Sequence, residues 1–321
     1  MRIYRLDAAI VATLAALSFR LDANETAAFA RELESLRTEV VEYNFPELKA
    51  RMLIPLETGV DEGAETLTWY EFQDTGLAKM IVNYADDLET VESYGTKQTS
   101  PIESHGIAYM FSTQDLRAWR KTGRALDRRK AEMARKAIER RVDKVAALGD
   151  TIRNVPGFLK NANVPLLTTG LVKLWATTAT PAQILSDLLE ITYTIRTQSK
   201  QTHAANAMIM GTNTYKIVAT TIFSPETGKT VLQAFLEAQQ DIKSIDTWVH
   251  CDLADAGNDG ERLVVYEKNP SNMGLVVPLE FAQHPAQAKS LMFYVPCEGR
   301  IGGAVIYKPL SMAYVDALLD A

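Results

Sequence analysis

The longest pattern of apolar and polar positions in the chain runs from Gln114 to Leu148. Apolar residues recur there every three or four positions, and basic residues occupy most of the remaining circumference. Thr113 is the expected N-cap, and Gly149 stands where such a helix would end. The pattern therefore predicts one helix about 52 Å long. Gly123 is its weak point, because Gly costs about 1 kcal/mol relative to Ala inside a helix.

Three shorter helical patterns precede and follow this helix. Asn24 is a candidate N-cap for a helix that closes before Pro46. Another helix begins at Thr180-Pro181, because proline suits the first helical position. A further one covers about Thr230 to Gln240. The helix that begins at Thr180-Pro181 is expected to bury Ile184, Leu188, Ile191 and Ile195.

Strand patterns fill much of the remaining chain. From Met52 to about Ser112, short alternating runs are punctuated by Gly and Pro and contain few residues suited to a core. We expect this segment to be a long, solvated hairpin that protrudes. Further strands are predicted at 207–210, 263–266, 291–295 and 301–307. The sequence thus predicts an α+β fold with one very long helix and no internal repeat.

The composition narrows the class of protein. The chain has 321 residues, of which 47% are hydrophobic and 23% charged, and these values exclude disordered, collagen-like and low-complexity proteins. No apolar run is long enough to span a bilayer, so no transmembrane helix is expected. The stretch Ala8–Leu17 is interpreted as a short amphipathic helix rather than a signal peptide. Cys251 and Cys297 are expected to be buried thiols, as in a protein of the reducing cytoplasm.

Two blocks of opposite charge lie in a chain whose formal net charge is −6. Residues 117–144 contain 12 Lys or Arg and 4 Asp or Glu, a local charge of +8. Residues 57–92 contain 10 acidic residues and one lysine, a local charge of −9. Because the basic block is not balanced within its own helix, compensation is expected from outside it. Nucleic-acid phosphate is one candidate, and the acidic block of another copy is the second.

Candidate catalytic and metal sites carry weak signals. Residues 224–230 end in Gly-Lys-Thr, but Phe223 stands where a phosphate-binding loop needs its first glycine, so a turn before a helix is favoured. His250 and Cys251 are adjacent on a predicted strand, where neighbouring side chains point to opposite faces. The other histidines lack the spacing of metal ligands. We expect no enzyme activity, no cofactor and no metal.

Several short segments follow one another in an order typical of a known family: Ala50–Pro55, Asp74–Ala78, Ser100–Ile102, Tyr109–Leu116, Gly149–Asp150, Gly157–Asn161, Gly299–Val305 and Lys308–Pro309. This order resembles that of the tailed-phage major capsid proteins, whose Hong Kong 97 fold is shared by encapsulin shells. The resemblance covers about Phe29 to Asp316. Lys160 departs from the Leu that is usual at its position.

The resemblance implies that the α+β chain is divided into four parts. They would be an N-terminal arm (1–48), an extended β-hairpin loop (49–105), a peripheral domain that contains the spine helix 114–148 (106–180 and 289–321), and an axial domain (181–288). In this fold the function is geometric. Hexamers and pentamers of the chain would tile an icosahedral shell that encloses double-stranded DNA.

Other functions stay open beside this one. An encapsulin-like shell around cargo protein is the alternative, and an enzyme or binding module is a distant third. The implied partners are other copies of the chain, packaged DNA held by non-specific contacts, and portal, scaffolding or decoration proteins, without a membrane. The protein would reside in the virion after assembly in the host cytoplasm.

The hairpin and the basic helix supply the candidate site residues. In the family that the chain resembles, the extended loop of one subunit lies across its neighbour. We therefore expect an interface between subunits at Asp61, Glu62, Glu65, Trp69, Glu71, Phe72 and Asp74. The spine helix is expected to turn a basic face toward the neighbour or the shell interior, with candidates Arg128, Arg129, Arg135 and Arg140.

Overall fold

The computed structural model describes residues 46–75, 90–122, 126–167, 175, 179–226, 228–252 and 261–316. All of these except Pro46 belong to one compact unit, Glu47–Ala321. The helix predicted to start at Asn24, and most of the predicted N-terminal arm, lie outside the described residues. Within the described part of the chain, no helix combines the length and the apolar character needed to cross a membrane.

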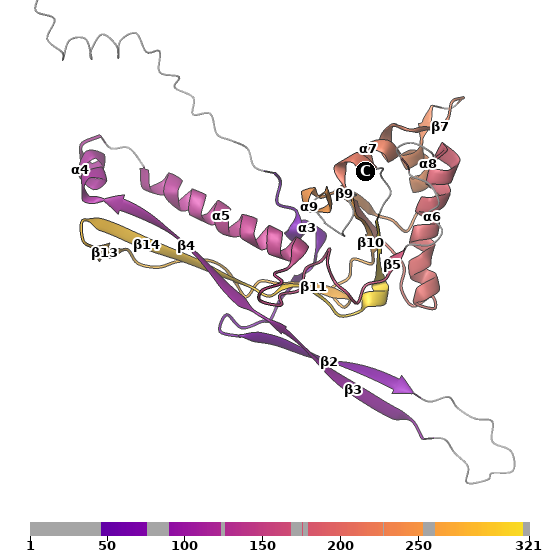
Figure 1. The fold of residues 1–321 in the computed structure, drawn as a ribbon, viewed down its shortest axis with the longest axis horizontal. Helices are drawn as coiled ribbons and strands as arrows, with labels where there is room; N and C mark the ends of the chain where they lie inside the picture. Colours follow the sequence, from indigo (N-terminus) through magenta and orange to yellow (C-terminus); the bar gives the residue numbers. More distant parts are fainter. Residues whose placement is uncertain are drawn as a thin grey trace, which may run out of the picture. The chain divides into compact units, whose positions relative to one another are not determined.

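Helix α5 (Leu126–Leu148) lies along one face of an antiparallel sheet (Figure 1). The strands of this sheet are β12 (Leu279–Gln283), β14 (Met292–Ile301), β13 (Gln287–Lys289) and β4 (Glu103–Ser112). Alternation along the strands decides which side chains face the helix, so Tyr109 and Val295 are buried whereas Met110 is exposed. Ile138, in the predicted apolar stripe of α5, packs into the same core.

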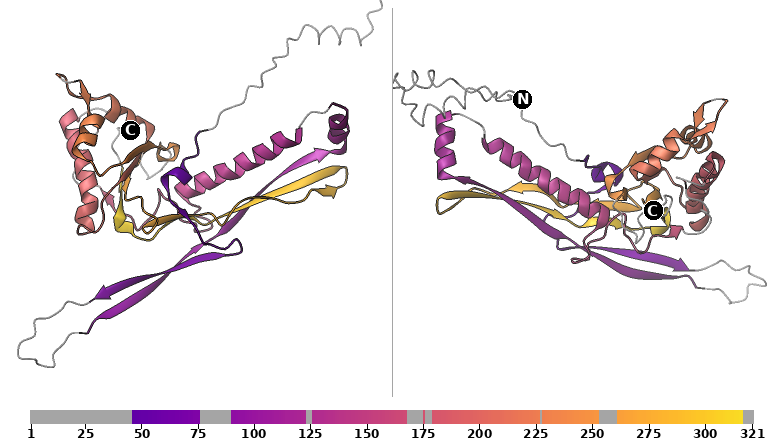
Figure 2. Two further views of the ribbon diagram at one scale, coloured as in Figure 1. Left: turned by 180° about the vertical axis from the view of Figure 1, so that it is seen from behind. Right: turned by 45° about the horizontal axis from the view of Figure 1, so that its top comes forward.

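The single helix predicted over residues 114–148 is two helices in the structure. The first, α4 (Thr113–Thr122), points in a different direction from α5 (Figures 1 and 2). Residues 123–125 between them lie outside the described part of the chain. The prediction of one continuous helix is therefore wrong. The sequence itself marks this region as weak, because glycine, which stands at position 123, has a low helix propensity.

Ser112, rather than the predicted Thr113, caps α4. The Asp115 backbone N–H donates to Ser112 Oγ at 3.0 Å, and the Ser112 N–H donates to the Asp115 carboxylate at 3.1 Å. This reciprocal pair is a capping box. The hydrogen bonds from Ser112 hold the pKa of Asp115 below its ordinary value.

Glycines let the loop after α5 pack against a three-stranded sheet. The sheet consists of β1 (Leu56–Glu57), β11 (Met273–Val276) and β15 (Gly303–Ile306). Gly303 has a φ of +76°, and a Cβ there would lie 2.7 Å from Val155 Cγ1 and closer still to the Pro156 carbonyl oxygen. Gly149, which ends α5 as predicted, has a φ of +72°, and a Cβ there would lie 2.5 Å from the Val155 carbonyl oxygen. Larger residues at these positions would separate the loop from the sheet.

A five-stranded sheet forms a second layer of the unit, and its three central strands are buried on both faces. Its order is β5 (Leu166–Leu167), β16 (Met312–Val315), β10 (Leu263–Tyr266), β6 (Ala207–Met210) and β9 (Ser244–Thr247). Val264 and Tyr266 belong to the core that α5 covers, and Leu263 and Val265 belong to a second core on the opposite face. Burial on both faces explains why β10, β6 and β16 read as continuous apolar runs rather than alternating ones.

Three helices surround the second core (Figure 1). They are α6 (Pro181–Gln198), α7 (Thr212–Thr220) and α8 (Val231–Ala238). The four residues predicted to face inward from α6 are all buried, which confirms that prediction. The hairpin of β7 (Ile222–Ser224) and β8 (Lys229–Thr230) leads into α8, so the segment 224–230 is a turn before a helix, as predicted. The 3₁₀ helix η1 (Pro309–Ser311) precedes β16.

A buried carboxylate, Asp143 on α5, joins this helix to two other segments. Its Oδ1 accepts a hydrogen bond at 2.8 Å from the N–H of Ala50, the first residue of α3 (Ala50–Leu53). Its Oδ2 lies 2.9 Å from His250 Nε2 and 3.4 Å from Trp248 Nε1. His250 belongs to the short helix α9 (Val249–Asp252), so the strand predicted at this position is wrong.

Strand pairing crosses the boundaries predicted between the peripheral and axial domains. β16 lies in the predicted peripheral range but pairs with β10 in the five-stranded sheet. β11 lies in the predicted axial range but pairs with β1 and β15. A strand pairs with the strands that complete its backbone hydrogen bonds, and these need not be its neighbours in sequence. The division into domains stays a prediction.

Of the segment Met52–Ser112 predicted to be a protruding hairpin, the described part that projects is an antiparallel ribbon of β2 (Thr66–Thr75) and β3 (Glu92–Pro101) (Figures 1 and 2). The prediction is wrong for the two ends of the segment, because Leu53 and Ile54 are buried and β4 pairs with β14 in the sheet that α5 covers. We call residues 66–75 and 92–101 the arm, which is distinct from the N-terminal arm predicted over residues 1–48. Its root is packed, because Leu67 and Trp69 contact a small cluster around Val305. Beyond the root, most described side chains of the arm are exposed.

Candidate assembly surfaces

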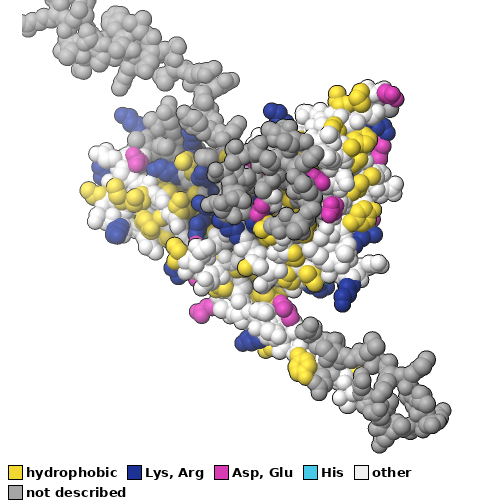
Figure 3. Space-filling view, turned by 45° about the vertical axis from the view of Figure 1, so that its right-hand side comes forward, with side chains coloured by type: hydrophobic (Ala, Val, Ile, Leu, Met, Phe, Trp, Pro, Cys, Tyr) yellow, Lys and Arg dark blue, Asp and Glu magenta, His cyan; other side chains and the backbone are white. Residues whose placement is uncertain are grey.

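One face of the arm carries an exposed aromatic pair. Phe72 and Tyr70 are 70% and 61% exposed, and their rings stack with centroids 6.3 Å apart. Gly95 lies opposite Phe72, and a Cβ there would lie 2.9 Å from the ring, so the glycine lets the ring extend across the ribbon. Figure 3 shows hydrophobic side chains exposed on the arm. Such a surface is typical of an interaction site.

The opposite face of the arm is anchored to its own chain. Trp69 contacts Tyr307 edge to face, with ring centroids 5.4 Å apart. The Trp69 indole N–H also donates to Glu71 Oε1 at 3.1 Å. Trp69 is therefore only partly exposed, although the sequence grouped it with Phe72 as an interface residue. Tyr70 was missed by sequence reasoning, although its place two residues before Phe72 put it on the same face of the strand.

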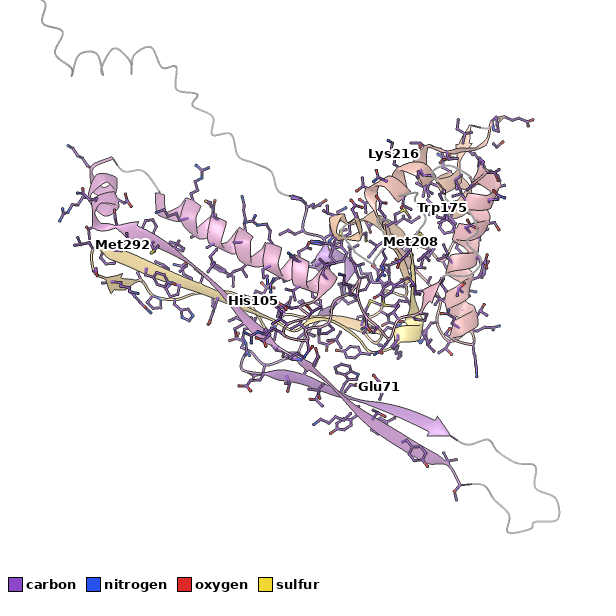
Figure 4. The ribbon with its side chains drawn as sticks, in the orientation of Figure 1. Glu71, His105, Trp175, Met208, Lys216 and Met292 are labelled. Atoms are coloured by element: carbon purple, nitrogen blue, oxygen red, sulfur yellow. The ribbon has the colours of Figure 1, made fainter. Side chains whose placement is uncertain are left out.

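The acidic candidates of the arm and its root lie at the surface. Asp61, Glu62, Glu65 and Glu71 are exposed, and Glu71 lies on β2 (Figure 4). Asp61 Oδ1 accepts a hydrogen bond from the Gly63 N–H at 2.7 Å. Within the described residues, none of these four carboxylates forms an ion pair with Lys or Arg. The side chain of Asp74 lies outside the described part of the structure.

The basic candidates divide into two rows on α5. Arg129 and Arg140 are eleven residues apart, about three helical turns, and so share one side of the helix. Arg128 and Arg135 are seven residues apart, about two turns, and share a second side. Arg129, Arg135 and Arg140 are exposed, and the side chain of Arg128 lies outside the described part. The structure thus places Arg129, Arg135 and Arg140 on the solvent side of α5, but it does not bring them beside the described acidic residues of the arm.

A further apolar surface, which sequence reasoning missed, lies on the face of β4 and β14 turned away from α5. Met110, Met292 and Tyr294 are 51%, 48% and 36% exposed. Met110 pairs with Tyr294 in the ladder, and Met292 lies at the start of β14 (Figure 4). The sequence of one strand does not reveal this surface, because it depends on which residues of β4 and β14 pair with each other.

A polar pocket of about 240 Å³ lies between β4, α5 and the loop that follows α5. His105 lines this pocket, and its Nε2 is buried with no hydrogen-bond partner in the described part of the chain. Burial, with a smaller effect from Arg141, lowers the pKa of His105. Arg141 pairs with Asp150 at 2.6 Å and Arg153 with Glu103 at 3.5 Å, so charges of both signs surround the imidazole.

The described residues offer little chemistry for catalysis or metal binding. They contain no group of His, Cys, Asp and Glu side chains arranged to hold a metal ion. Cys251 and Cys297 are buried, and burial raises the pKa of both thiols, which keeps them protonated and unreactive. The arrangement is suited to contact between macromolecular surfaces.

Comparison with known proteins gives the family and the fold. The family model described as major capsid protein matches residues 76–318. Among solved structures, the capsid of Myoviridae phage XM1 has a TM-score of 0.77 at 16% identity, over 90% of this chain and 98% of that chain. The capsid of the native GTA particle has a TM-score of 0.61 at 11% identity, over 94% and 100% of the two chains. No curated protein matches the chain.

A structure from Mycobacterium phage Adephagia is also similar, with a TM-score of 0.60 at 12% identity, over 92% of this chain and 97% of that chain. At these identities the structural likeness establishes a Hong Kong 97-like fold, as the sequence predicts. The family match spans most of the chain and includes β3 of the arm, α5 and all strands of the four- and five-stranded sheets. The chain therefore belongs to the major capsid protein family, the shell proteins of phage capsids.

Proposed function

We propose that hexamers and pentamers of this chain tile a closed icosahedral shell that encloses double-stranded DNA. Membership of the major capsid protein family supports a shell. The observation that carries the proposal is the exposed pair Tyr70 and Phe72 on the projecting arm. Apolar area left in water costs about 25 cal/mol per Å², so burial of this pair against another copy would favour association.

In the proposed shell, the arm of one copy lies across the next. The aromatic pair supplies apolar contact, and acidic residues of the arm and its root face basic residues of the neighbour. The acidic residues are Asp61, Glu62, Glu65, Glu71 and Asp74, and the basic candidates are Arg128, Arg129, Arg135 and Arg140. Each exposed ion pair contributes only about 0–1 kcal/mol, so the register of the shell would depend on many repeated pairs.

Basic residues that stay unpaired would face the interior of the shell. There they would neutralise phosphates of packaged DNA without regard to sequence. Portal, scaffolding or decoration proteins are further proposed partners. The protein would act as a structural component of the virion, without catalysis, after assembly in the host cytoplasm.

The arm is tested by Phe72→Asp, with Thr99→Asp as the control on the same face of the ribbon. Both residues are exposed, so neither change should alter the thermal stability of the subunit. We expect Phe72→Asp to reduce the yield of shells in electron micrographs at least about tenfold, because it places a charge in an apolar contact. Thr99→Asp should assemble. Shells of Phe72→Asp at the wild-type yield would refute the role of the arm.

The enclosed material is tested on shells purified from cells that carry the phage genome. We expect DNA that resists added nuclease until the shells are opened. Shells that contain protein cargo and no DNA would favour the encapsulin-like alternative.

A further inference from the structure

A groove of about 740 Å³ lies at the root of the arm, between β2 and the segments around residues 270 and 307. Its lining includes Glu57, Trp69, Glu71, Phe72, Tyr307 and Lys308. The groove therefore combines aromatic walls with two carboxylates and one ammonium group. It lies beside the exposed aromatic pair and at the foot of the strand proposed to reach a neighbour.

The aromatic walls are held in place by contacts within the chain. Trp69 and Tyr307 meet edge to face, with their ring planes at 84°. The Trp69 indole N–H donates to Glu71 Oε1 at 3.1 Å, and the Tyr307 hydroxyl donates to Glu57 Oε2 at 3.1 Å. Each ring is thus bound to one carboxylate.

Glu57 has its position fixed from a second side. Gly274 leaves the space that Glu57 occupies, because a Cβ at position 274 would lie 2.6 Å from Glu57 Oε2. Burial and the carboxylate of Glu57 raise the pKa of Tyr307, so the phenol stays a hydrogen-bond donor at neutral pH. Glu57 therefore stays in the groove with its second oxygen available for another donor.

The two carboxylates have no cationic partner in the described part of the chain. Neither Glu57 nor Glu71 lies within ion-pairing distance of a Lys or Arg there, and α5 contributes no residue to the groove's lining. Lys308 also lines the groove, but no ion pair joins it to either carboxylate. A cation that enters from outside would meet a carboxylate on either side and aromatic rings between them, which is the environment that favours guanidinium or ammonium groups.

We infer that this groove is a socket for a basic side chain of a second copy of the chain. The inference rests on the proposed function and deepens it, because it names the contact that receives the neighbour. Charge complementarity identifies the occupant. The strand and loop over residues 57–71 carry five acidic residues and no Lys or Arg, whereas residues 117–144 of each copy carry a charge of +8. An arginine fits best, because its planar fork can stack on an indole and bind a carboxylate through two N–H groups.

The test compares two double variants that remove the same charge. Glu57→Gln with Glu71→Gln neutralises the socket while each amide oxygen can still accept its hydrogen bond from Tyr307 or Trp69. Glu190→Gln with Glu226→Gln removes two charges from exposed positions outside both the groove and the arm. The readouts are the lowest protein concentration that yields shells, and the NaCl concentration at which shells dissociate. The thermal stability of each subunit is measured alongside.

We expect the socket variant to raise the critical concentration about tenfold and to lower the dissociating salt concentration, because charge-assisted contacts in a partly desolvated groove are the stronger ones. The control should change both values much less. Equal effects of the two double variants would overturn the socket and leave only an effect of the changed net charge. If Phe72→Asp abolishes shells while the socket variant assembles normally, the proposed function stands and this inference fails.

Discussion

His105 shows how one buried imidazole can make a subunit sensitive to acid. Its pKa is below the ordinary 6.5, chiefly because burial disfavours the charged form, and Arg141 adds to the effect. Below about pH 6.5 the unfolded chain binds a proton at this position that the folded chain resists. The stability that His105 provides is therefore complete above pH 6.5 and is lost as the pH falls toward the folded-state pKa. Glu103 and Asp150 oppose the shift but do not cancel it.

We expect His105→Gln to weaken the dependence of subunit stability on pH. Between pH 7 and pH 5 the melting temperature of the variant should fall less than that of the wild type. His284→Gln is the control, because that imidazole is half exposed and lies 2.9 Å from Glu298. Identical pH profiles of His105→Gln and wild type would show that His105 does not titrate within this window.

At the scale of elements, the junction between the loop after α5 and the strand β15 depends on glycine. Gly303 and Gly228 both have positive φ, +76° and +65°. They differ in surroundings, because a Cβ at position 303 would collide with Val155 and Pro156, whereas at position 228 nothing lies within 4 Å. Alanine substitutions at these two positions therefore separate the free-energy cost of the backbone conformation from that of the steric collision.

We expect Gly228→Ala to lower the free energy of unfolding by about 1 kcal/mol, the cost of the left-handed conformation. Gly303→Ala should cost at least about 3 kcal/mol, because the collision forces the loop away from β15. Chemical denaturation of the two variants measures both values. Similar losses of unfolding free energy for the two variants would mean that the loop moves away from the added methyl group at no energetic cost.

At the scale of the whole molecule, the two charge blocks do not neutralise each other within the described part of one subunit. The carboxylates of Asp61, Glu62, Glu65 and Glu71 have no Lys or Arg partner there, and the exposed arginines lie on the solvent side of α5. Blocks that stay apart in the subunit can meet between subunits. This arrangement would make assembly sensitive to salt, because exposed charges are screened over about 8 Å at physiological ionic strength.

We expect Arg128→Glu, Arg129→Glu and Arg135→Glu together to impair shell formation. Adding Glu62→Lys, Glu65→Lys and Asp74→Lys to the same chain should restore part of it, because the reversed charges again attract each other. Light scattering during assembly measures both effects. Normal assembly of the first triple variant would rule out the pairing between subunits, and impairment without rescue would leave only a role toward DNA.

The sequence by itself determined the features that arise from contacts within a few residues. The apolar stripe of α6, the turn before α8 and the strands of the arm follow from side-chain periodicity, capping and turn chemistry. The protruding nature of the arm was also predictable, because too few of its residues suit a core. The fold could be predicted from the order of the short segments, because a family keeps the order of its structural elements even where single residues vary.

Only the tertiary structure decided how distant segments combine. β16 and β11 were not predicted as strands, and their places in two different sheets depend on partners far away in the sequence. Trp69 and Phe72 looked equivalent in the sequence, yet Trp69 packs on Tyr307 while Phe72 faces solvent. The groove beside them exists because Glu57, Trp69 and Tyr307 converge from three separate strands or their ends. Periodicity reports which side of an element is apolar, whereas burial depends on what the rest of the chain places against that side.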